Sequence, residues 1–295
     1  MIAQLTAAGA EEGLLTWSPS RGLTVEPDSA TVMANGPLLV ADSWLVREGR
    51  VRGYGRHRER FLRACAESDG PGPRRLVEFW HDMTAVLPRT GEWFPRVELA
   101  AGSLELRLRL RHAPPLGSEV RLWAVGQPDP RTLPRRKGPD LDALARVRGR
   151  AVEEGAQEGI LVDSSGTVLE SATASVLWWE DDTLCLPPAG SPLLPGITAG
   201  LIQERALRSG TRVAHRKRTL PELADREVWL VNALHGIRPV TSWTGNGNGN
   251  GNGNGNGNGN GARAGIGEAM TAGPATRAAE WRNWLEKLPE PLPNM

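Results

Sequence analysis

The stretch EGILVDSSGTVLESATASVLW, residues 158–178, says most about the fold of this chain. It contains two apolar runs, residues 159–163 and 167–170, on either side of Ser164-Ser165-Gly166. Glycine in the last position of that turn can adopt a positive φ, so the pattern predicts a β-hairpin. Short strands of this kind, alternating with helical stretches elsewhere in the chain, predict an α/β fold.

Glu170 ends the second strand of this hairpin, and small residues follow it up to Ser175. A carboxylate at the end of a strand could accept a hydrogen bond from a protonated heterocyclic nitrogen. It could equally be a solvated surface group, so Glu170 alone does not define a site.

Downstream of the hairpin, LLPGIT at residues 193–198 leads into a predicted helix at residues 197–209. The first N–H groups of a helix have no partner within it, and the helix dipole is positive at this end. Ile197 and Thr198 could therefore bind a phosphate, with the Thr198 hydroxyl as a further donor. The plain alternative is an ordinary helix start.

Upstream of the hairpin lies Lys137, one of only three lysines among 35 basic residues. An amine can lose its proton and attack a carbonyl, whereas a guanidinium stays protonated. Lys217 and Lys287 lie in polar surroundings that indicate solvated positions. Lys137, within Pro134-Arg135-Arg136-Lys137-Gly138-Pro139, is therefore the lysine most open to a chemical role.

A fourth feature is His57-Arg58-Glu59-Arg60-Phe61, within a predicted helix at residues 56–66. His57 and Arg60 are three residues apart, so both lie on one face of that helix. The guanidinium of Arg60 could hold a phosphate through two hydrogen bonds.

The chain divides into two predicted domains. Residues 1–113 mix strands and helices in an α+β pattern, residues 114–117 indicate a linker, and residues 118–244 form an α/β domain. The other predicted strands are residues 36–46, 50–52, 96–99, 104–111, 119–125, 175–179, 182–186 and 227–232, and the other predicted helices are residues 76–87 and 140–154.

Residues 104–111 alternate leucine with charged side chains, which puts Leu104 and the three leucines after it on one face of a strand. Arg107, Arg109 and Arg111 are expected on the other face. Such a face is usually solvated, but three arginines could also meet an anionic substrate or a partner chain.

The C-terminal part begins with a strict Gly-Asn repeat at residues 245–261. The repeat has no apolar side chain to bury, so we expect a disordered linker. Within residues 262–295, Trp281, Trp284 and Leu285 recur at helical spacing, which predicts a short helix docked on the second domain.

The 295 residues carry a formal net charge of +1, without a basic stripe that would indicate a nucleic acid partner. The two cysteines match no metal-binding or disulfide spacing, so no metal site is expected. No signal peptide or membrane-spanning window is recognisable. We therefore expect a cytoplasmic protein.

Taken together, the His-x-x-Arg-Phe of residues 57–61, the isolated Lys137, the hairpin stretch and LLPGIT resemble the class IV aminotransferases. These are the fold-type IV enzymes that use pyridoxal phosphate (PLP). The 33 residues from Lys137 to Glu170 are similar to the family's separation of its cofactor lysine and its glutamate. The resemblance runs over about residues 38–240 and implies two domains with the active site between them.

The resemblance implies a role for each residue. Lys137 would form the internal aldimine with PLP and move protons on the face of the cofactor, while Glu170 would keep the pyridine nitrogen protonated. The phosphate would be bound by Arg60, Ile197 and Thr198.

Other positions depart from the family pattern. Ser175 stands where an asparagine is usual and counts among the implied cofactor contacts. The family's Ser-Arg-Gly strand end, which can supply a substrate-binding arginine, reads Ala100-Ala101-Gly102. The substrate pocket is thus rebuilt more than the cofactor pocket. The candidates for substrate binding are Ser43, Arg107, Arg109, Asn232 and His235.

The segment NALHGIRPV at residues 232–240 is most similar to the aminodeoxychorismate lyase branch. It implies a lyase of folate biosynthesis that converts 4-amino-4-deoxychorismate to 4-aminobenzoate and pyruvate. Two alternatives stay open: a PLP-dependent aminotransferase for a branched-chain, D- or unusual amino acid, and a non-catalytic binding protein on the same fold. The resemblance also implies a homodimer.

Overall fold

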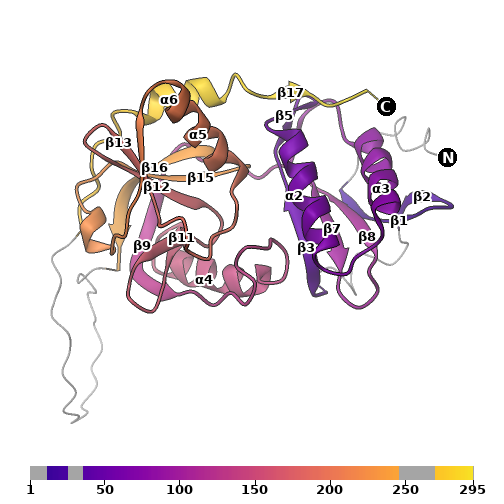
Figure 1. The fold of residues 1–295 in the computed structure, drawn as a ribbon, viewed down its shortest axis with the longest axis horizontal. Coiled ribbons are helices and arrows are strands. Elements are labelled where there is room, and N and C mark those ends of the chain that lie inside the picture. The colour runs from indigo at the N-terminus through magenta and orange to yellow at the C-terminus, as the bar shows by residue number, and fades with distance from the viewer. Residues whose placement is uncertain (1–11, 26–35, 246–269, 295) are drawn as a thin grey trace, which may run out of the picture.

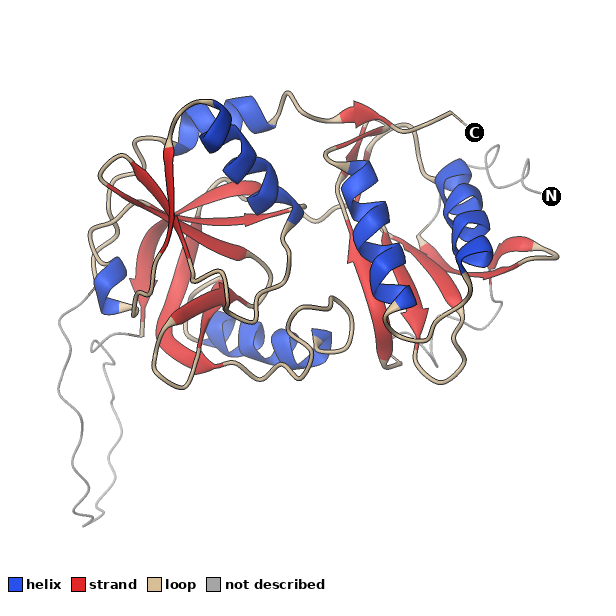
Figure 2. Ribbon diagram, viewed as in Figure 1, coloured by secondary structure: helices blue, strands red, loops and turns tan. Residues whose placement is uncertain are grey.

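A five-stranded antiparallel sheet forms the centre of the N-terminal domain of the computed structural model (Figure 1). The structure describes residues 12–25, 36–245 and 270–294. In spatial order the strands are β2 (Gly22–Val25), β1 (Gly13–Ser18), β8 (Leu106–Leu110), β7 (Arg96–Ala100) and β3 (Leu38–Ser43). Helices α2 (Tyr54–Ala66) and α3 (Pro73–Val86) cover one face of this sheet (Figure 2).

The leucine alternation in β8 sets which face of the sheet meets the helices. Leu106, Leu108 and Leu110 are buried in one core with Phe61 of α2 and Phe79 of α3. The arginines between them point to the opposite face. The expectation for Leu104 is wrong: it precedes the strand in a left-handed conformation with φ 55°, and its side chain is 38% exposed.

A small four-stranded sheet flanks this domain in the order β17 (Glu290–Pro291), β5 (Arg50–Val51), β4 (Val46–Arg47) and β6 (Glu92–Trp93). The turn between β4 and β5 lies in the gap between the predicted strands 36–46 and 50–52. Gly49 there has φ 66°, and a Cβ on it would lie 3.0 Å from the carbonyl oxygen of Arg89, so only glycine fits without strain.

An eight-stranded mixed sheet forms the C-terminal domain. Its order is β11 (Val168–Ser171), β10 (Glu158–Val162), β9 (Val120–Pro128), β16 (Gly236–Thr244), β15 (Val228–Asn232), β12 (Ser175–Glu180), β13 (Thr183–Leu186) and β14 (Arg212–His215). A further pairing of β11 with β12, Glu170 opposite Ser175, closes part of the sheet on itself. The predicted hairpin of residues 159–170 is thus the closing edge.

Helices surround this sheet: α4 (Leu141–Glu153), α5 (Ile197–Arg208), the 3₁₀ turn η1 (Pro221–Leu223) and α6 (Ala278–Leu285). Trp281 of α6 lies with its ring centroid 5.7 Å from that of Trp179 and 5.9 Å from that of Trp229. The amphipathic stripe of α6 therefore packs against the second domain. Apart from Gly245, the Gly-Asn repeat expected to be disordered lies outside the described residues.

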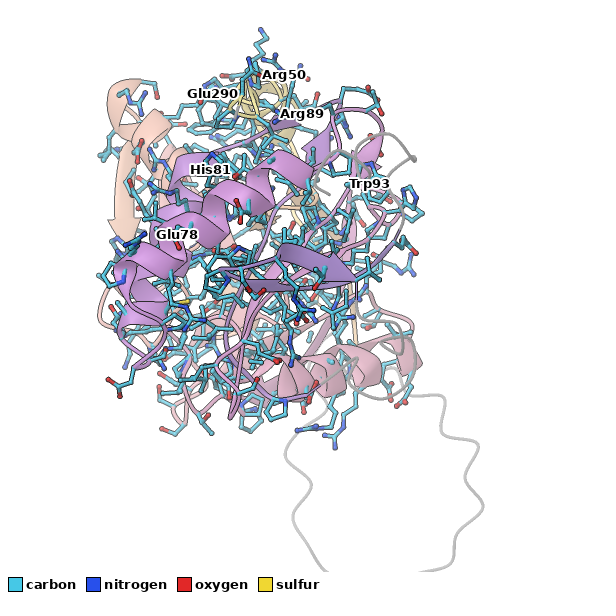
Figure 3. The ribbon with its side chains drawn as sticks, turned by 90° about the vertical axis from the view of Figure 1, so that its right-hand side faces the viewer. Arg50, Glu78, His81, Arg89, Trp93 and Glu290 are labelled. Carbon is cyan, nitrogen blue, oxygen red and sulfur yellow. The ribbon has the colours of Figure 1, made fainter. Side chains whose placement is uncertain are left out.

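The tail beyond α6 makes contacts that the expected helix docking on the second domain did not include. It crosses to the N-terminal domain, where β17 pairs with β5 and Leu292 is buried in the first core. Arg50 donates to the carbonyl oxygen of Pro289 at 2.6 Å, and Arg89 donates to that of Leu292 at 2.8 Å (Figure 3). The two domains are therefore linked twice, by residues 114–117 and by this tail. No helix in the described ranges is long and apolar enough to cross a membrane.

Candidate active site

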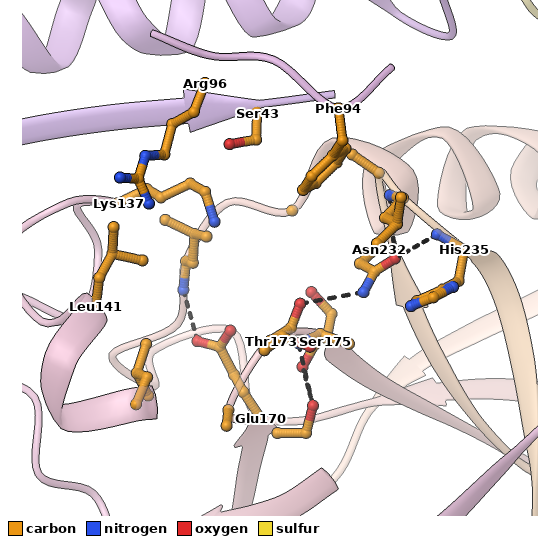
Figure 4. A pocket seen from close by; sticks show the side chains of 18 of the residues that line it. Ser43, Phe94, Arg96, Lys137, Leu141, Glu170, Thr173, Ser175, Asn232 and His235 are labelled. Carbon is orange, nitrogen blue, oxygen red and sulfur yellow. Dashed lines mark hydrogen bonds between the residues drawn. The ribbon is translucent and has the colours of Figure 1, made fainter. Parts of the chain in front are cut away.

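A cavity of about 650 Å³ lies between the two domains. Ser43, Phe94 and Arg96 of the N-terminal domain face Glu170 and Thr173 of the C-terminal domain across it (Figure 4). This volume falls in the range of pockets that hold cofactors and organic ligands. The sequence-predicted residues can be placed around it one by one.

Lys137 lines this cavity from the loop that precedes α4. Its carbonyl oxygen accepts a hydrogen bond of 2.7 Å from the N–H of Ala41, which lies on β3 in the other domain. Burial, and next the charge of Arg60, lower the pKa of the Lys137 amine to about 8. At that pKa a substantial share of the amine is neutral near pH 8, when it can act as a nucleophile or a base.

Beside Ala41, the carboxylate of Asp42 is fully buried and binds two side chains of α2. His57 donates through Nδ1 at 2.8 Å, and Arg60 donates through Nε at 2.8 Å and through Nη2 at 2.7 Å. Burial by itself would raise the pKa of Asp42, but Arg60 and His57 outweigh it and hold that pKa well below its usual value. Burial lowers the pKa of His57, and the charge of Asp42 opposes that shift.

The N-terminal end of α5 forms another part of the wall. No side chain of the described residues caps this helix, and Ile197 and Thr198 line the cavity in its first turn, where backbone N–H groups have no partner within the helix. A Cβ on Gly196 would lie 2.6 Å from the Oγ of Ser175, so a larger residue here would require that hydroxyl to rotate away. Arg60 reaches the same place from α2, because its Nη1 donates to the carbonyl oxygen of Pro195 at 2.9 Å.

This arrangement fits a phosphate group. A helix N-terminus, a threonine hydroxyl and a guanidinium meet at one end of the cavity, and all three favour a phosphate dianion. Arg60, Ile197, Thr198 and Ser175, four of the residues expected to bind the cofactor, are thus brought together from three elements.

Glu170 lies across the cavity from Lys137, at the end of β11. Its Oε1 accepts hydrogen bonds of 2.7 Å from Nη1 of Arg131 and from the N–H of Leu194. Oε2 accepts no hydrogen bond from any described residue, although the side chain lines the cavity. Burial raises the pKa of Glu170, and Arg131 opposes that shift. Oε2 is therefore placed to accept a hydrogen bond from a protonated ring nitrogen, as the resemblance implies.

Two further arginines of the N-terminal domain line the cavity, Arg96 at the start of β7 and Arg111 after the end of β8. Nε of Arg111 donates to the carbonyl oxygen of Phe94 at 2.8 Å, and its guanidinium lies 4.9 Å from the centre of the Phe94 ring. Both arginines act to lower the pKa of Lys137, so their charges are felt at the amine. This end of the cavity favours an anionic group.

Arg107 and Arg109 are not among the residues that line the cavity. Arg107 pairs with Glu105, and Nε of Arg109 donates to Glu98 at 3.0 Å. They share the arginine face of β8 with Arg111, but the strand carries them away from the domain junction. Of that face, only Arg111 reaches the cavity.

Asn232 and His235 belong to the turn between β15 and β16 and line the cavity. Oδ1 of Asn232 accepts hydrogen bonds from the N–H groups of Leu234 at 3.1 Å and of His235 at 2.8 Å (Figure 4). Nδ1 of His235 accepts from the N–H of Gly117 in the linker at 3.1 Å. Burial, with the charge of Arg238 next, lowers the pKa of His235 to about 4, so the ring is neutral. Asn232 thus fixes the shape of this turn at the cavity wall.

The sequence analysis did not single out three residues that line the cavity or bind its lining side chains: Asp42, Arg96 and Arg131. Asp42 lies within the predicted strand of residues 36–46, and Arg96 begins the predicted strand of residues 96–99. The charge of a residue in a strand does not by itself show which partner or site the side chain faces. Arg131 lies 39 positions before Glu170. A buried carboxylate needs a charged partner, and that rule is the one signal that could have suggested a search for them.

Among the described residues, no group of three or more His, Cys, Asp or Glu side chains could hold a metal ion.

Several known proteins share this architecture. The profile of the family described as amino-transferase class IV matches residues 39–243. The branched-chain-amino-acid aminotransferases of Escherichia coli (strain K12) and Salmonella typhimurium are 33% identical over 120 residues. These matches cover 39% of this chain and 38% of each relative, so the whole relative is not represented.

Solved structures share the fold at lower identity. The fold IV transaminase CpuTA1 of Curtobacterium pusillum has a TM-score of 0.69 at 18% identity and covers 93% of this chain and 99% of its own. A hypothetical aminotransferase of Mycobacterium tuberculosis in a PLP-bound form gives 0.68 at 18% identity, with 94% and 98% covered. A candidate 4-amino-4-deoxychorismate lyase of Legionella pneumophila gives 0.65 at 16% identity, with 84% and 90% covered.

These matches confirm the expected α/β class and the fold-type IV architecture, and they confirm the resemblance on which the cofactor expectation rests. The family match alone spans well over half of the chain. The chain therefore belongs to the class IV aminotransferases, a family of PLP-dependent enzymes.

Proposed function

We propose that this chain holds PLP in the cavity between its domains and acts as a lyase on 4-amino-4-deoxychorismate, releasing 4-aminobenzoate and pyruvate. The observation that carries the PLP assignment is that Lys137 and Glu170 face each other across one cavity. The N-terminal end of α5, which would bind the phosphate, lines the same cavity. Lys137 would hold the cofactor covalently, Glu170 its ring nitrogen, and Arg60, Ile197 and Thr198 its phosphate.

The positive charge of the arginines that line the cavity indicates the class of substrate. Arg96 and Arg111 line the cavity near the Lys137 amine, and a substrate with two carboxylates would offset their positive field. 4-Amino-4-deoxychorismate has two carboxylates. The segment of residues 232–240, in which Asn232 holds the turn at the cavity wall, supports the lyase branch over other branches.

The residues of the chain would divide the work as follows. Bound PLP supplies an electron sink for the electron pair left when a bond at the amino-bearing carbon breaks. Nζ of Lys137 takes the proton from that ring carbon, because it is largely neutral above pH 8. Arg96 and Arg111 would hold the carboxylates. The ring carbon–oxygen bond to the enolpyruvyl group breaks, and Nζ of Lys137 would give the proton that it took to the departing enolpyruvate, which becomes pyruvate. The ring that remains is aromatic, which makes the reaction downhill.

An aminotransferase is the second candidate. It is favoured by the 33% identity to branched-chain-amino-acid aminotransferases over 120 residues. A structural neighbour from Mycobacterium tuberculosis was solved with α-ketoglutarate and PMP, and a dicarboxylate of that kind also suits Arg96 and Arg111. Both candidates use the same cofactor residues and differ in the substrate pocket.

One experiment separates the candidates. The PLP-loaded protein is incubated with enzymatically prepared 4-amino-4-deoxychorismate, and 4-aminobenzoate is measured. A parallel reaction contains branched-chain or D-amino acids with 2-oxoglutarate, and glutamate is measured. Formation of 4-aminobenzoate that is lost in Lys137→Ala supports the lyase. Glutamate formation alone would replace it by the aminotransferase, and neither product from protein that has bound PLP would count against both.

We also propose a homodimer. On the sheet face opposite the helices, 20% of the Arg109 side chain is exposed, so Arg109 remains a candidate for contact with a second copy of the chain. Arg107 is buried and is the weaker candidate. Light scattering at micromolar concentration tests this directly. A fully active monomer would overturn it.

A further inference from the structure

We propose that Asp42 is a positioning residue for the cofactor phosphate, because it fixes the guanidinium of Arg60 against the N-terminal end of α5. The inference rests on the proposed binding of PLP, but not on which reaction follows. Asp42 itself does not line the cavity, so it would act only through Arg60.

Asp42 and Arg60 form a clamp, by which we mean that the carboxylate binds the guanidinium through two hydrogen bonds. Both carboxylate oxygens take part: Oδ2 accepts from Nε of Arg60 at 2.8 Å and Oδ1 accepts from Nη2 at 2.7 Å. The third nitrogen, Nη1, donates to the carbonyl oxygen of Pro195 at 2.9 Å. A guanidinium has five N–H donors, so one on each terminal nitrogen remains for a ligand. The one on Nη1 lies beside the residues that begin α5, because the other donor of Nη1 binds Pro195.

The carboxylate is itself held rigidly. Its Oδ1 accepts a hydrogen bond of 2.7 Å from the N–H of Ser43 and another of 2.8 Å from His57. The ring of His57 is buried, with its centroid 5.5 Å from that of Trp44. Asp42 is thus fixed by its own strand and by α2 before any ligand arrives. A long arginine side chain loses much conformational freedom when it is held, and here that ordering precedes cofactor binding.

The alternative is that Asp42 only stabilises the fold as one member of a buried ion pair. The two roles predict different effects of an Asp42 substitution on the binding of PLP and of pyridoxal. A purely structural defect would weaken binding of PLP and of pyridoxal, which lacks the phosphate, by similar factors. A positioning defect would weaken binding of PLP alone, because pyridoxal makes no contact with Arg60.

The test uses the apoenzyme of Asp42→Asn, Arg60→Met and the double variant, with absorbance titrations of PLP and of pyridoxal. The measured quantity is the dissociation constant of pyridoxal divided by that of PLP. This ratio falls when the binding of PLP alone is weakened. Asp42→Asn should reduce this ratio on the order of tenfold, the scale of one charge-assisted hydrogen bond. In the Arg60→Met background the same substitution should change the ratio no further, because the group it positions is gone.

A matched control exists on the same helix. Arg56 of α2 forms a two-pronged pair with Glu204 of α5, and neither residue lines the cavity. Glu204→Gln should therefore leave the ratio unchanged. Asp42→Glu, which keeps the charge but displaces the clamp, provides a second variant should Asp42→Asn not fold, and its ratio should also fall.

Three outcomes would overturn the proposal: equal loss of both affinities in Asp42→Asn, an unchanged ratio in Asp42→Glu, or a further loss in the Arg60→Met background. Failure of the proposed function gives a different result, since the unmodified protein would then bind neither PLP nor pyridoxal covalently. Protein that binds PLP but yields no 4-aminobenzoate would leave the test of Asp42 intact.

Discussion

The N–H of Ala41 donates a hydrogen bond of 2.7 Å to the carbonyl oxygen of Lys137, and this bond crosses from one domain to the other. The lysine on which the proposed chemistry depends is therefore held by the sheet of the domain that does not contain it. Gly138 makes the approach possible, because its φ of 134° suits glycine and a Cβ would lie 2.8 Å from the nitrogen of Ala41.

Gly138→Ala should therefore separate the Lys137 loop from β3. A side chain at this position must push the backbone of Ala41 away, which breaks the bond and strains the φ angle. We expect a loss of about 1–3 kcal/mol in the free energy of unfolding and weaker retention of PLP, measured by urea denaturation and by dialysis followed by absorbance. Gly149→Ala is the matched control, because Gly149 lies within α4 with open space at its Cβ position. It should be neutral or slightly stabilising, and equal loss in both variants would contradict the assignment.

The pH dependence of cofactor capture should follow Lys137. Its pKa of about 8 lies below the ordinary value of 10.5, so the neutral amine that attacks PLP is available at lower pH than in a free lysine. The capture rate, followed by stopped-flow absorbance, should rise with pH up to about 8 and then level off. The charged amine is disfavoured in the folded state below pH 8, and this destabilisation disappears between pH 8 and 10.5, so the apoenzyme gains stability from this group over that interval. A capture rate that still rises steeply above pH 9 would show an ordinary amine.

Arg111→Met should impair substrate binding more than cofactor binding. The variant removes one of the two cations, Arg96 and Arg111, that are proposed to hold the substrate carboxylates. KM for a substrate with two carboxylates should therefore rise on the order of tenfold or more. It should also raise the pKa of Lys137, since Arg111 lowers it. Steady-state kinetics and the capture profile measure these effects. Arg150→Met, an exposed change on α4, should alter neither, and an unchanged KM in Arg111→Met would remove Arg111 from the substrate site.

Leu292→Ala should reveal how much the C-terminal tail contributes to stability. Leu292 is 2% exposed in the core of the N-terminal domain, although it follows the helix that docks on the other domain. Its truncation should cost about 2–5 kcal/mol in the free energy of unfolding, measured in urea. Leu207→Ala, at a position 68% exposed on α5, should change that energy by less than about 0.5 kcal/mol. Similar small effects in both would mean that the tail is dispensable.

Much of this architecture was predictable because its signals are local. The hairpin around Gly166, the start of α5 at Ile197 and the leucine face of β8 each follow from spacing and backbone preference within a few residues. Lys137 stands out for a chemical reason, since an amine can form an imine with a carbonyl whereas a guanidinium stays protonated. Glu170 gained a role only from its resemblance to the family pattern, and its burial became visible only in the structure.

Tertiary structure alone decided the contacts between distant positions. Asp42 meets Arg60, Arg131 meets Glu170, and the tail places Leu292 in the core of the first domain. The sequence of β8 presents Arg107, Arg109 and Arg111 as equivalent, yet only Arg111 reaches the cavity, because the strand meets the second domain at one end. Local pattern determines which face a side chain takes, but its partners depend on how the two domains come together, and no short-range spacing encodes that.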